Sequence, residues 1–250
     1  MATHLLQIKV HRRLLSAACL LTASLLLSAC ISSQPYPSGV PATQPIPAPT
    51  TRAPKIGQEW VYNVRNVFNQ ELVDVVTERV VSVGEQIRIQ RSGAKAGPLP
   101  DEIQSPWGYV LQDAHWNPPQ KFIKPMPLWP EQLTSGFNHF YKTQYQVLGY
   151  PDGNYYWGMS MKARQWELIQ VPAGQFLTLK YHDEMPYFES NDVFRVSNIR
   201  DEDVWFSPEI GRWVIRRGLG VTSLMGYFGP MLTGRTTSSG SLCPGSKLSA

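Results

Sequence analysis

Alternation of apolar and polar residues at every second position recurs through this chain and restricts it to β-structure. Gln58–Phe68 is rich in aromatic and β-branched residues, Leu72–Val83 is dense in valine, and Gln86–Gln90 alternates strictly. Strands with one buried face show this period of two. Segments of the same kind predict further strands at 141–148, 155–170 with a break, 175–182, 193–199, 204–206 and 212–217. No segment shows a clear amphipathic helical pattern.

The predicted strands follow one another about every ten residues, a spacing that favours antiparallel neighbours. We therefore predict an all-β domain over residues 55–235, built as an antiparallel meander or open barrel, or as a sandwich, with a flexible tail over 236–250. Residues 98–130 contain eight prolines. Because proline cannot donate a ladder hydrogen bond, this segment is predicted to be an irregular excursion.

The first 29 residues have the layout of a secretory signal peptide. Lys9, Arg12 and Arg13 precede an apolar run that ends in Leu27-Ser28-Ala29-Cys30. The run of about 14 residues is shorter than the roughly 20 needed to cross a membrane. The alternative is an ordinary cleaved signal with a soluble product. Its A-x-A cleavage site requires small residues, and Leu27 is a poor fit at that site.

The same four residues resemble the lipobox of bacterial lipoproteins. The resemblance implies that Cys30 becomes the acylated first residue of the mature chain and anchors it in the membrane. No apolar segment of sufficient length precedes Cys19, so we predict that Cys19 lies within the signal peptide and is not lipidated. Ile31 in place of Asp implies the outer membrane, as in enteric-type lipoproteins, with the protein on its periplasmic side.

Residues 30–54 are predicted to be a linker behind the lipidated cysteine. Seven of residues 31–54 are proline, and Arg52 is the one charged residue among them. Such a segment favours extended polyproline conformation at roughly 3 Å per residue, which gives a reach of about 70 Å.

Charge and cysteine usage exclude several classes of function. Without Lys9, Arg12 and Arg13 the mature chain has 20 basic residues (23 minus three) and 19 acidic ones, with no basic run, so no nucleic-acid partner is expected. Cys30 and Cys243 are the two cysteines that remain, which predicts no disulfide framework. Cys243 is either a free thiol or the site of an intermolecular disulfide. No Cys/His spacing indicates a metal site.

Three motifs resemble those of uncharacterised Gram-negative envelope proteins, many of them lipoproteins. They are Gly57-Gln58-Glu59-Trp60-Val61-Tyr62, Val171-Pro172-Ala173-Gly174-Gln175-Phe176, and the segment from Val204 to Val214. The last motif predicts a hairpin that pairs Trp205 with Val214. The resemblance implies a curved, β-rich half-barrel, with no established activity and no catalytic residues.

Catalytic signals are weak, and we predict that the chain is not an enzyme and binds no cofactor or metal. His115, His139 and His182 lie in no recognisable triad, and no G-x-S-x-G segment is present. His182 is read as a surface residue at a strand end. Asp201-Glu202-Asp203 is read as a solvated turn, with paired-carboxylate catalysis as the alternative.

Aromatic residues are concentrated in one part of the chain. Of 28 Trp, Tyr and Phe residues, 14 lie between Ser105 and Trp166. They could line an apolar cavity or a sugar-stacking surface, or simply pack the core. The candidate ligand-binding residues are Trp107, Trp116, Trp129, Tyr155 and Trp157.

Three functions remain open from the sequence. The leading one is a non-enzymatic lipoprotein whose β-domain binds another envelope component, a protein or peptidoglycan. The alternative is a carrier or acceptor of lipids or lipoproteins with an apolar concave pocket. The third is a hydrolase that uses His182 or Asp201-Glu202-Asp203. A dry apolar concavity would favour the carrier, and a sheet filled by its own side chains would favour the first function.

Overall fold

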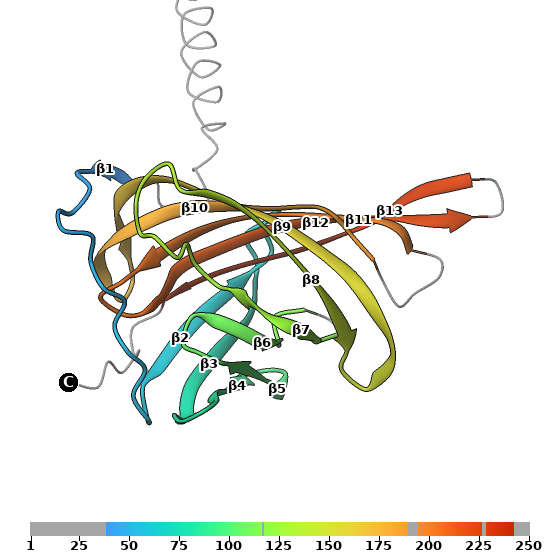
Figure 1. The fold of residues 1–250 in the computed structure, drawn as a ribbon, viewed down its shortest axis with the longest axis horizontal. Helices are drawn as coiled ribbons and strands as arrows, with labels where there is room; N and C mark the ends of the chain where they lie inside the picture. Colours follow the sequence, from blue (N-terminus) through green and yellow to red (C-terminus); the bar gives the residue numbers. More distant parts are fainter. Residues whose placement is uncertain (1–38, 117, 190–194, 227–228, 243–250) are drawn as a thin grey trace, which may run out of the picture. The chain divides into compact units, whose positions relative to one another are not determined.

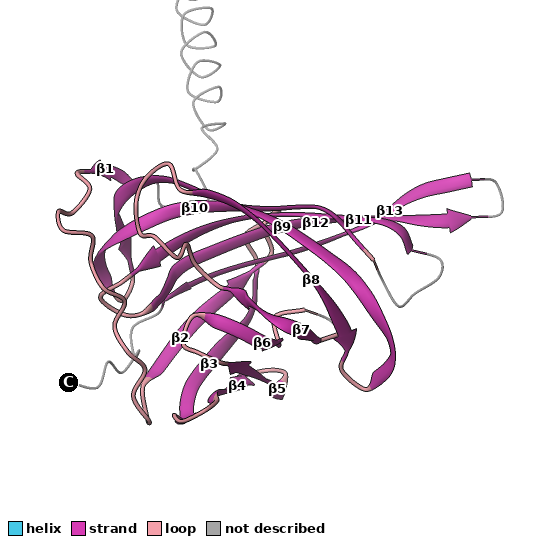
Figure 2. Ribbon diagram, viewed as in Figure 1, coloured by secondary structure: helices cyan, strands magenta, loops and turns pink. Residues whose placement is uncertain are grey.

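The computed structural model describes residues 39–242 except 117, 190–194 and 227–228. Within these residues every regular element is a β-strand (Figures 1 and 2), so the predicted all-β class is confirmed. No described helix is long and apolar enough to span a membrane. The strands are β1 (Val40–Ala42), β2 (Glu59–Arg65), β3 (Leu72–Ser82), β4 (Ile87–Gly93), β5 (Gly97–Gln104), β6 (Tyr109–Asp113), β7 (Gln120–Pro127), β8 (Asn138–Val147), β9 (Tyr150–Val171), β10 (Gly174–Phe188), β11 (Arg195–Ser207), β12 (Arg212–Gly226) and β13 (Gly229–Leu242).

The period of two in the sequence becomes an inner and an outer face of the sheet. Along β3, Val76, Glu78 and Val80 are buried, while residues between them are partly or fully exposed. In β4, Ile87, Ile89 and Arg91 alternate in the same way with exposed residues. Successive side chains of a strand point to opposite faces, so the valine and isoleucine positions set which face is inside.

All thirteen strands belong to one antiparallel sheet, so of the two predicted architectures the curved single sheet is observed. The order is β1-β9-β10-β11-β12-β13-β2-β3-β4-β5-β6-β7-β8, and β8 also pairs with β9. The long strands β9–β12 run across the shorter strands β2–β7 (Figure 1). Between β7 and β8 the pairing extends only from Gln120–Val147 to Phe122–Tyr145, and the sheet is open beyond that point.

The prediction of an irregular excursion over residues 98–130 is wrong, because this segment forms β5, β6 and β7. Two of its prolines lie where the ladder is interrupted, while Pro98 and Pro127 stand in register opposite Ser92 and Tyr109. Pro100 lies in the irregularity between the Ile89–Glu102 and Arg91–Leu99 pairs, and Pro125 lies in a similar one between β6 and β7. A bulge leaves a residue without a ladder partner, so the missing N–H of proline costs nothing there.

Residues 39–54, the described part of the linker predicted over 30–54, lie against the sheet and do not form a free spacer. Val40–Ala42 pairs with Trp166–Leu168 of β9. The Arg52 N–H donates to the carbonyl of Pro208 (2.8 Å), and the Trp107 indole N–H donates to the carbonyl of Arg52 (3.0 Å). A proline-rich segment cannot form a core, but it can pair at a strand edge and be fixed by its carbonyl groups. Cys30 lies outside the described residues.

The C-terminal boundary also differs from the predicted one. The flexible tail was placed at 236–250, whereas β13 continues to Leu242. Ser239–Leu242 pairs with Tyr62–Arg65, so the last strand, β13, is joined to β2 near the start of the domain. Pairing across the sheet stabilises a Ser/Gly-rich segment that local sequence marks as flexible. Cys243 lies outside the described residues.

The hairpin at the third motif forms with a register different from the predicted one. Trp205 pairs with Ile215, and Phe206 with Trp213, because a bulge shifts the register between them. The turn requires Gly211, whose φ of +68° favours glycine. The strands predicted at 193–199 and 204–206 are a single strand, β11.

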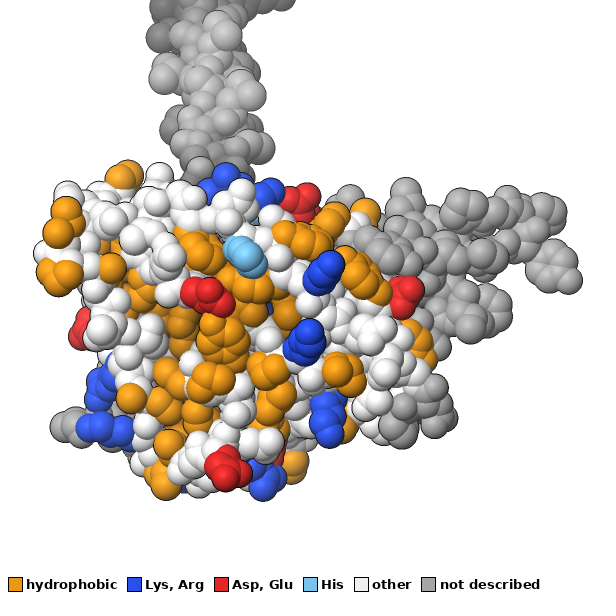
Figure 3. Space-filling model, viewed as in Figure 1, with side chains coloured by type: hydrophobic (Ala, Val, Ile, Leu, Met, Phe, Trp, Pro, Cys, Tyr) orange, Lys and Arg blue, Asp and Glu red, His pale blue; other side chains and the backbone are white. Residues whose placement is uncertain are grey.

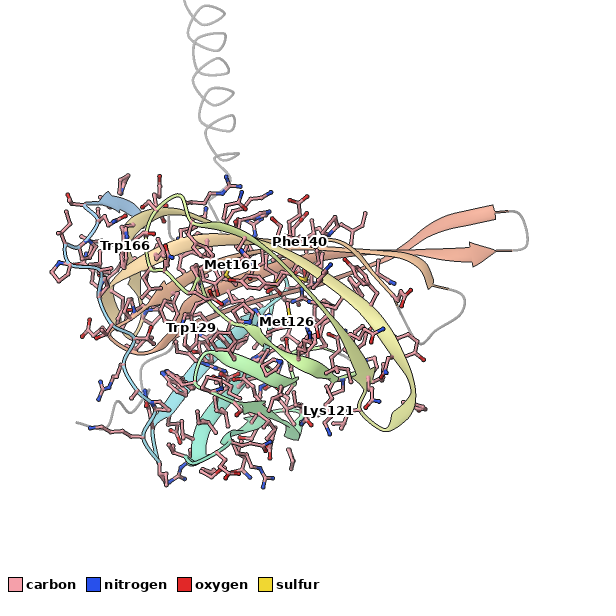
Figure 4. The ribbon with its side chains drawn as sticks, viewed as in Figure 1. Lys121, Met126, Trp129, Phe140, Met161 and Trp166 are labelled. Atoms are coloured by element: carbon pink, nitrogen blue, oxygen red, sulfur yellow. The ribbon has the colours of Figure 1, made fainter. Side chains whose placement is uncertain are left out.

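Aromatic and aliphatic side chains fill the inner side of the sheet. Trp129, Met126 and Met161 lie between the long and the short strands (Figure 4) and belong to one buried cluster. Trp60, Trp166 and Phe206 are among its largest fully buried members.

Candidate functional site

A buried ionic network crosses the interior of the sheet. Arg212 of β12 is 0% exposed and donates to Glu78 of β3 (2.7 Å) and to Glu102 of β5 (2.8 Å). Its guanidinium also lies over the Trp213 ring, 3.7 Å from the centroid. Burial lowers the pKa of Arg212, but Glu102 and Glu78 outweigh burial and raise it, so Arg212 stays charged.

His115 extends this network on the side of β6. Its Nε2 lies 2.8 Å from a carboxylate oxygen of Glu78, and its Nδ1 lies 3.0 Å from one of Asp113. Burial raises the pKa of Asp113, but the hydrogen bond and charge of His115 outweigh burial and hold it far below the usual range. Arg91 adds a further hydrogen bond to Glu78, at 3.1 Å. Among the described residues no group of His, Cys, Asp and Glu is arranged to hold a metal ion.

A second network lies on β10–β12, around a pair of carboxyl groups. Asp183 and Glu202 face each other across the β10–β11 ladder, and both are buried. Arg216 donates to Glu202 at 2.8 Å, and Arg200 pairs with the same carboxylate. Burial raises the pKa of Glu202, but the two arginines outweigh burial, so the net pKa is low. Burial and then the charge of Glu202 raise the pKa of Asp183 well above its usual value. The two carboxyl groups therefore have pKa values shifted in opposite directions.

This carboxyl pair borders a cavity of about 30 Å³, which is also lined by Trp116, Trp157 and Tyr181. Two buried polar atoms of its lining, Oδ1 of Asp183 and one terminal nitrogen of Arg216, have no hydrogen-bond partner among the described residues. A water molecule needs about 10–15 Å³ of such space and two to four polar partners. The cavity therefore fits one or two waters, and neither an acyl chain nor a sugar.

The five predicted ligand-binding residues do not form one site. Trp116 and Trp157 meet edge to face at 4.8 Å and line the cavity, while Tyr155 packs beside Tyr145. Trp107 and Trp129 meet each other at 5.4 Å in a separate group.

That second group is continuous with the apolar core. Trp107 stacks on Trp60 at 6.4 Å, and Trp129 stacks on Phe206 at 4.6 Å. Core packing therefore accounts for Trp107 and Trp129, and only Trp116 and Trp157 border enclosed space.

The acidic segment predicted to be a solvated turn lies inside a strand. Asp201, Glu202 and Asp203 belong to β11, where Glu202 points inward and its two neighbours point outward. His182 likewise lies within β10 and not at a strand end, 3.1 Å from a carboxylate oxygen of Asp203. The period of two in a strand turns Glu202 away from its two neighbours, so the three acids do not form one cluster. Asp201 and Asp203 share the outer face, where His182 lies 4.0 Å from Asp201.

Sequence reasoning missed Glu78, Glu102, Asp113 and Arg212 as interacting groups. A signal was available for Glu78, because it occupies the inward position between Val76 and Val80 in a valine-dense strand. A charged residue at an apolar position of the alternation indicates a buried partner of opposite charge. The identity of that partner, 134 residues later in the chain, has no local signal.

Comparisons with known proteins support the fold. No family model and no curated protein matches the chain. A crystal structure of a Bacteroides fragilis NCTC 9343 protein assigned to export, with a YmcC-like fold, is similar with a TM-score of 0.52 and 13% identity, over 79% of this chain and 99% of the other. The hypothetical lipoprotein YmcC of Escherichia coli K12 aligns with a TM-score of 0.40 and 10% identity, over 78% and 90%. The described domain thus shares the YmcC-like fold of the Bacteroides protein.

Proposed function

We propose that this chain is a non-enzymatic lipoprotein of the cell envelope whose β-domain binds another envelope component, a protein or peptidoglycan, through its outer surface. The observation that carries the proposal is the filled interior. The cavity beside Asp183 and Glu202 on the inner side is only about 30 Å³. Charged and aromatic side chains occupy the rest, so binding at an external surface is the function that the geometry supports best.

The packed interior counts against the lipid-carrier alternative. Ligand pockets for molecules of drug size run to several hundred Å³ and are predominantly apolar. The space here is water-sized and is bordered by Asp183, Glu202 and Arg216. An acyl chain in this position would displace ion pairs as well as core side chains.

Restricted access also counts against hydrolysis. The pKa values of Asp183 and Glu202 are shifted in opposite directions, as in many acid–base pairs, but the two residues are only 6% and 2% exposed. A general acid must come within hydrogen-bond distance of its substrate. The cavity leaves room there only for water, which supports a structural role for the pair.

Export and anchoring rest on the sequence, with the fold in agreement. Leu27-Ser28-Ala29-Cys30 places acylation at Cys30, and Ile31 directs the product to the outer membrane under the enteric rule. Several acyl chains on one residue are enough for stable attachment. The Bacteroides protein with the same fold is also assigned to export.

Labelled palmitate and membrane fractionation test the anchor in a Gram-negative host. Cys30→Ala should abolish incorporation and leave an unprocessed or mislocalised chain. Cys19→Ala and Cys243→Ala are the matched controls and should incorporate label as the parent does. A Cys30→Ala chain that is processed normally and soluble in the periplasm would refute the lipoprotein assignment.

Mass spectrometry of the gently purified mature protein tests the mode of binding. We expect no stoichiometric lipid beyond the acyl groups on Cys30, and we expect crosslinking in intact envelopes to capture a partner. A stoichiometric non-covalent lipid would establish the carrier alternative instead.

A further inference from the structure

A groove follows the opening between β7 and β8 on the outer side of the sheet. It has a volume of about 280 Å³ and is lined by Ile123, Lys124, Lys142, Thr143, Gln144 and Tyr156. It exists because the ladder between these strands stops at Phe122–Tyr145. Beyond that point the Thr143 side chain bridges the strands, accepting from the Lys124 N–H at 3.2 Å.

Gly158 lies opposite Lys142 on β9 and allows two aromatic side chains to pack closely over the backbone beside the groove. A Cβ atom at Gly158 would come within 2.7 Å of the Tyr156 hydroxyl and 2.9 Å of the Phe140 ring. The two aromatic side chains therefore lie directly over this glycine, on the outer face formed by β8 and β9. The strand arrangement thus builds the groove, and one small residue lies beside it.

The lysines at this groove form no ion pair within the described part of the chain, and the Glu189 carboxylate beside it accepts from the backbone N–H of Tyr156 at 2.7 Å. Lys124 and Lys142 line the groove, Lys121 lies nearby on β7, and none of the three forms an ion pair with a described residue. By contrast, Lys162 on β9 pairs with Glu184 at 2.9 Å. A groove flanked by unpaired ammonium groups favours an anionic occupant.

Exposed apolar side chains accompany these lysines. Ile123 is 51% exposed and Phe140 49%, and Leu148 and Tyr150 are exposed at the tip of the β8–β9 hairpin. Figure 3 shows Lys and Arg side chains beside an apolar area on one face of the molecule. Apolar and aromatic groups surrounded by lysines are the composition of surfaces that rest in a lipid interface.

The length of chain before β1 brings this face within reach of a membrane. From Cys30 to Gly39 there are nine residues, which span at most about 32 Å. Val40 pairs with Leu168 of β9, and Lys142 pairs with Gly158 of the same strand, ten residues away. Ten residues of strand measure about 33 Å. An anchor at Cys30 can therefore lie in a membrane that also touches the groove, whereas a 24-residue spacer would not have kept the domain close.

We propose that this face, comprising Lys121, Ile123, Lys124, Phe140, Lys142 and Tyr156, is a membrane-contact surface whose groove receives the phosphate headgroup of an anionic lipid. The inference rests on the proposed lipid anchor for its biological setting. The exposed apolar residues enter the interface, and the lysines meet lipid phosphates. Contact with the bilayer orients the domain and leaves its other faces for the envelope partner.

The test uses the mature chain with Cys30→Ser, so that binding does not depend on acylation. Its partition onto vesicles of equimolar phosphatidylglycerol and phosphatidylcholine is measured by flotation at low salt. Near an anionic surface each lysine contributes roughly a five-fold factor, so Lys124→Gln/Lys142→Gln should reduce the partition coefficient about 30-fold. Arg79→Gln/Lys95→Gln removes the same charge from strand β3 and the β4–β5 turn, and should change it less than about two-fold.

Several results would overturn the proposal. Equal losses in the two double variants would show a non-specific charge effect, and equal binding to pure phosphatidylcholine vesicles would exclude headgroup charge. Release of the protein from the vesicles by inorganic phosphate, at a concentration equal to that of the lipid phosphate, would show a site for free anions. Release by poly-glutamate would indicate an acidic protein partner. The outcome for the membrane anchor is separate, because it is read from palmitate labelling of Cys30.

Discussion

Replacing Arg212 with methionine should destabilise the domain more than any surface ion-pair change. Arg212 is fully buried, and its nitrogens lie 2.7 Å from Glu78 and 2.8 Å from Glu102. At the effective dielectric of about 20 that suits protein sites, each such pair has a gross attraction of about 4 kcal/mol. Most of this offsets the desolvation of the three charges. Arg212→Met leaves two carboxylates buried without that cation.

The expected loss is about 3–5 kcal/mol in the free energy of unfolding, the range for breaking a buried pair on one side. Against a total stability of about 5–15 kcal/mol, this is a large fraction. Urea unfolding followed by tryptophan fluorescence at pH 7.5 measures it. Arg88→Met is the matched control, because Arg88 is 58% exposed in its pair with Asp101, and it should cost less than about 1 kcal/mol.

The pH dependence provides a second readout of the same argument. In the parent, burial raises the pKa of Glu78, but Arg212 and His115 hold it well below its usual value. A carboxylate with a depressed folded pKa contributes stability above its unfolded pKa, and this contribution is lost as pH falls through the folded value. Arg212→Met removes the main cause of the depression, so the difference between variant and parent should shrink as pH falls below about 4.5. A loss under about 1 kcal/mol at pH 7.5, or a difference that grows in acid, would refute the reasoning.

Three further changes test other parts of the structure. Asp183→Asn should stabilise the protein increasingly as pH rises above about 4, because the folded state keeps Asp183 protonated while the unfolded chain ionises; a pH-independent difference in urea midpoint would contradict the raised pKa. Gly211→Ala places a Cβ 2.5 Å from the Arg52 carbonyl oxygen at a φ of +68°, so it should lower the free energy of unfolding by about 1–3 kcal/mol. It should also expose Arg52 to trypsin, and unchanged cleavage would argue against docking of residues 39–54. Trp157→Ala should cost about 3–5 kcal/mol in the free energy of unfolding, as expected for a core residue, whereas Tyr156→Ala should cost far less. Equally small losses would place both rings outside the core, and equally large losses would place both inside it.

Local pattern identified the strands whose sequence alternates. β2, β3 and β4 lie within about three residues of the predicted segments, because each has one apolar and one polar face. The same reasoning missed β5–β7, where prolines outweighed the alternation. Pairing tolerates proline at a bulge, and bulges depend on both strands of a pair, so a single strand does not reveal them.

The candidate site was less accessible to prediction than the fold. Aromatic density predicts Trp116 and Trp157 as site residues, and both border the cavity. It predicts Trp107 and Trp129 as well, but these two pack in the core. Period and propensity describe how one strand presents its residues, and they do not specify which strands face one another. Glu78, Glu102 and Arg212 contact one another because of the order of the strands in the sheet, and this order cannot be predicted from the local sequence.

By itself the sequence determined the all-β class and the inner face of the alternating strands, because these depend on interactions between residues close in the chain. It also carries the N-terminal motif from which lipidation at Cys30 is predicted. Only the tertiary structure decided the buried ion pairs, the docking of residues 39–54, the pairing of β13 with β2 and the groove between β7 and β8. The first three join segments distant in the chain, and the groove depends on where the pairing between two neighbouring strands stops. None of these features forms until the sheet has curved and brought the strands into register.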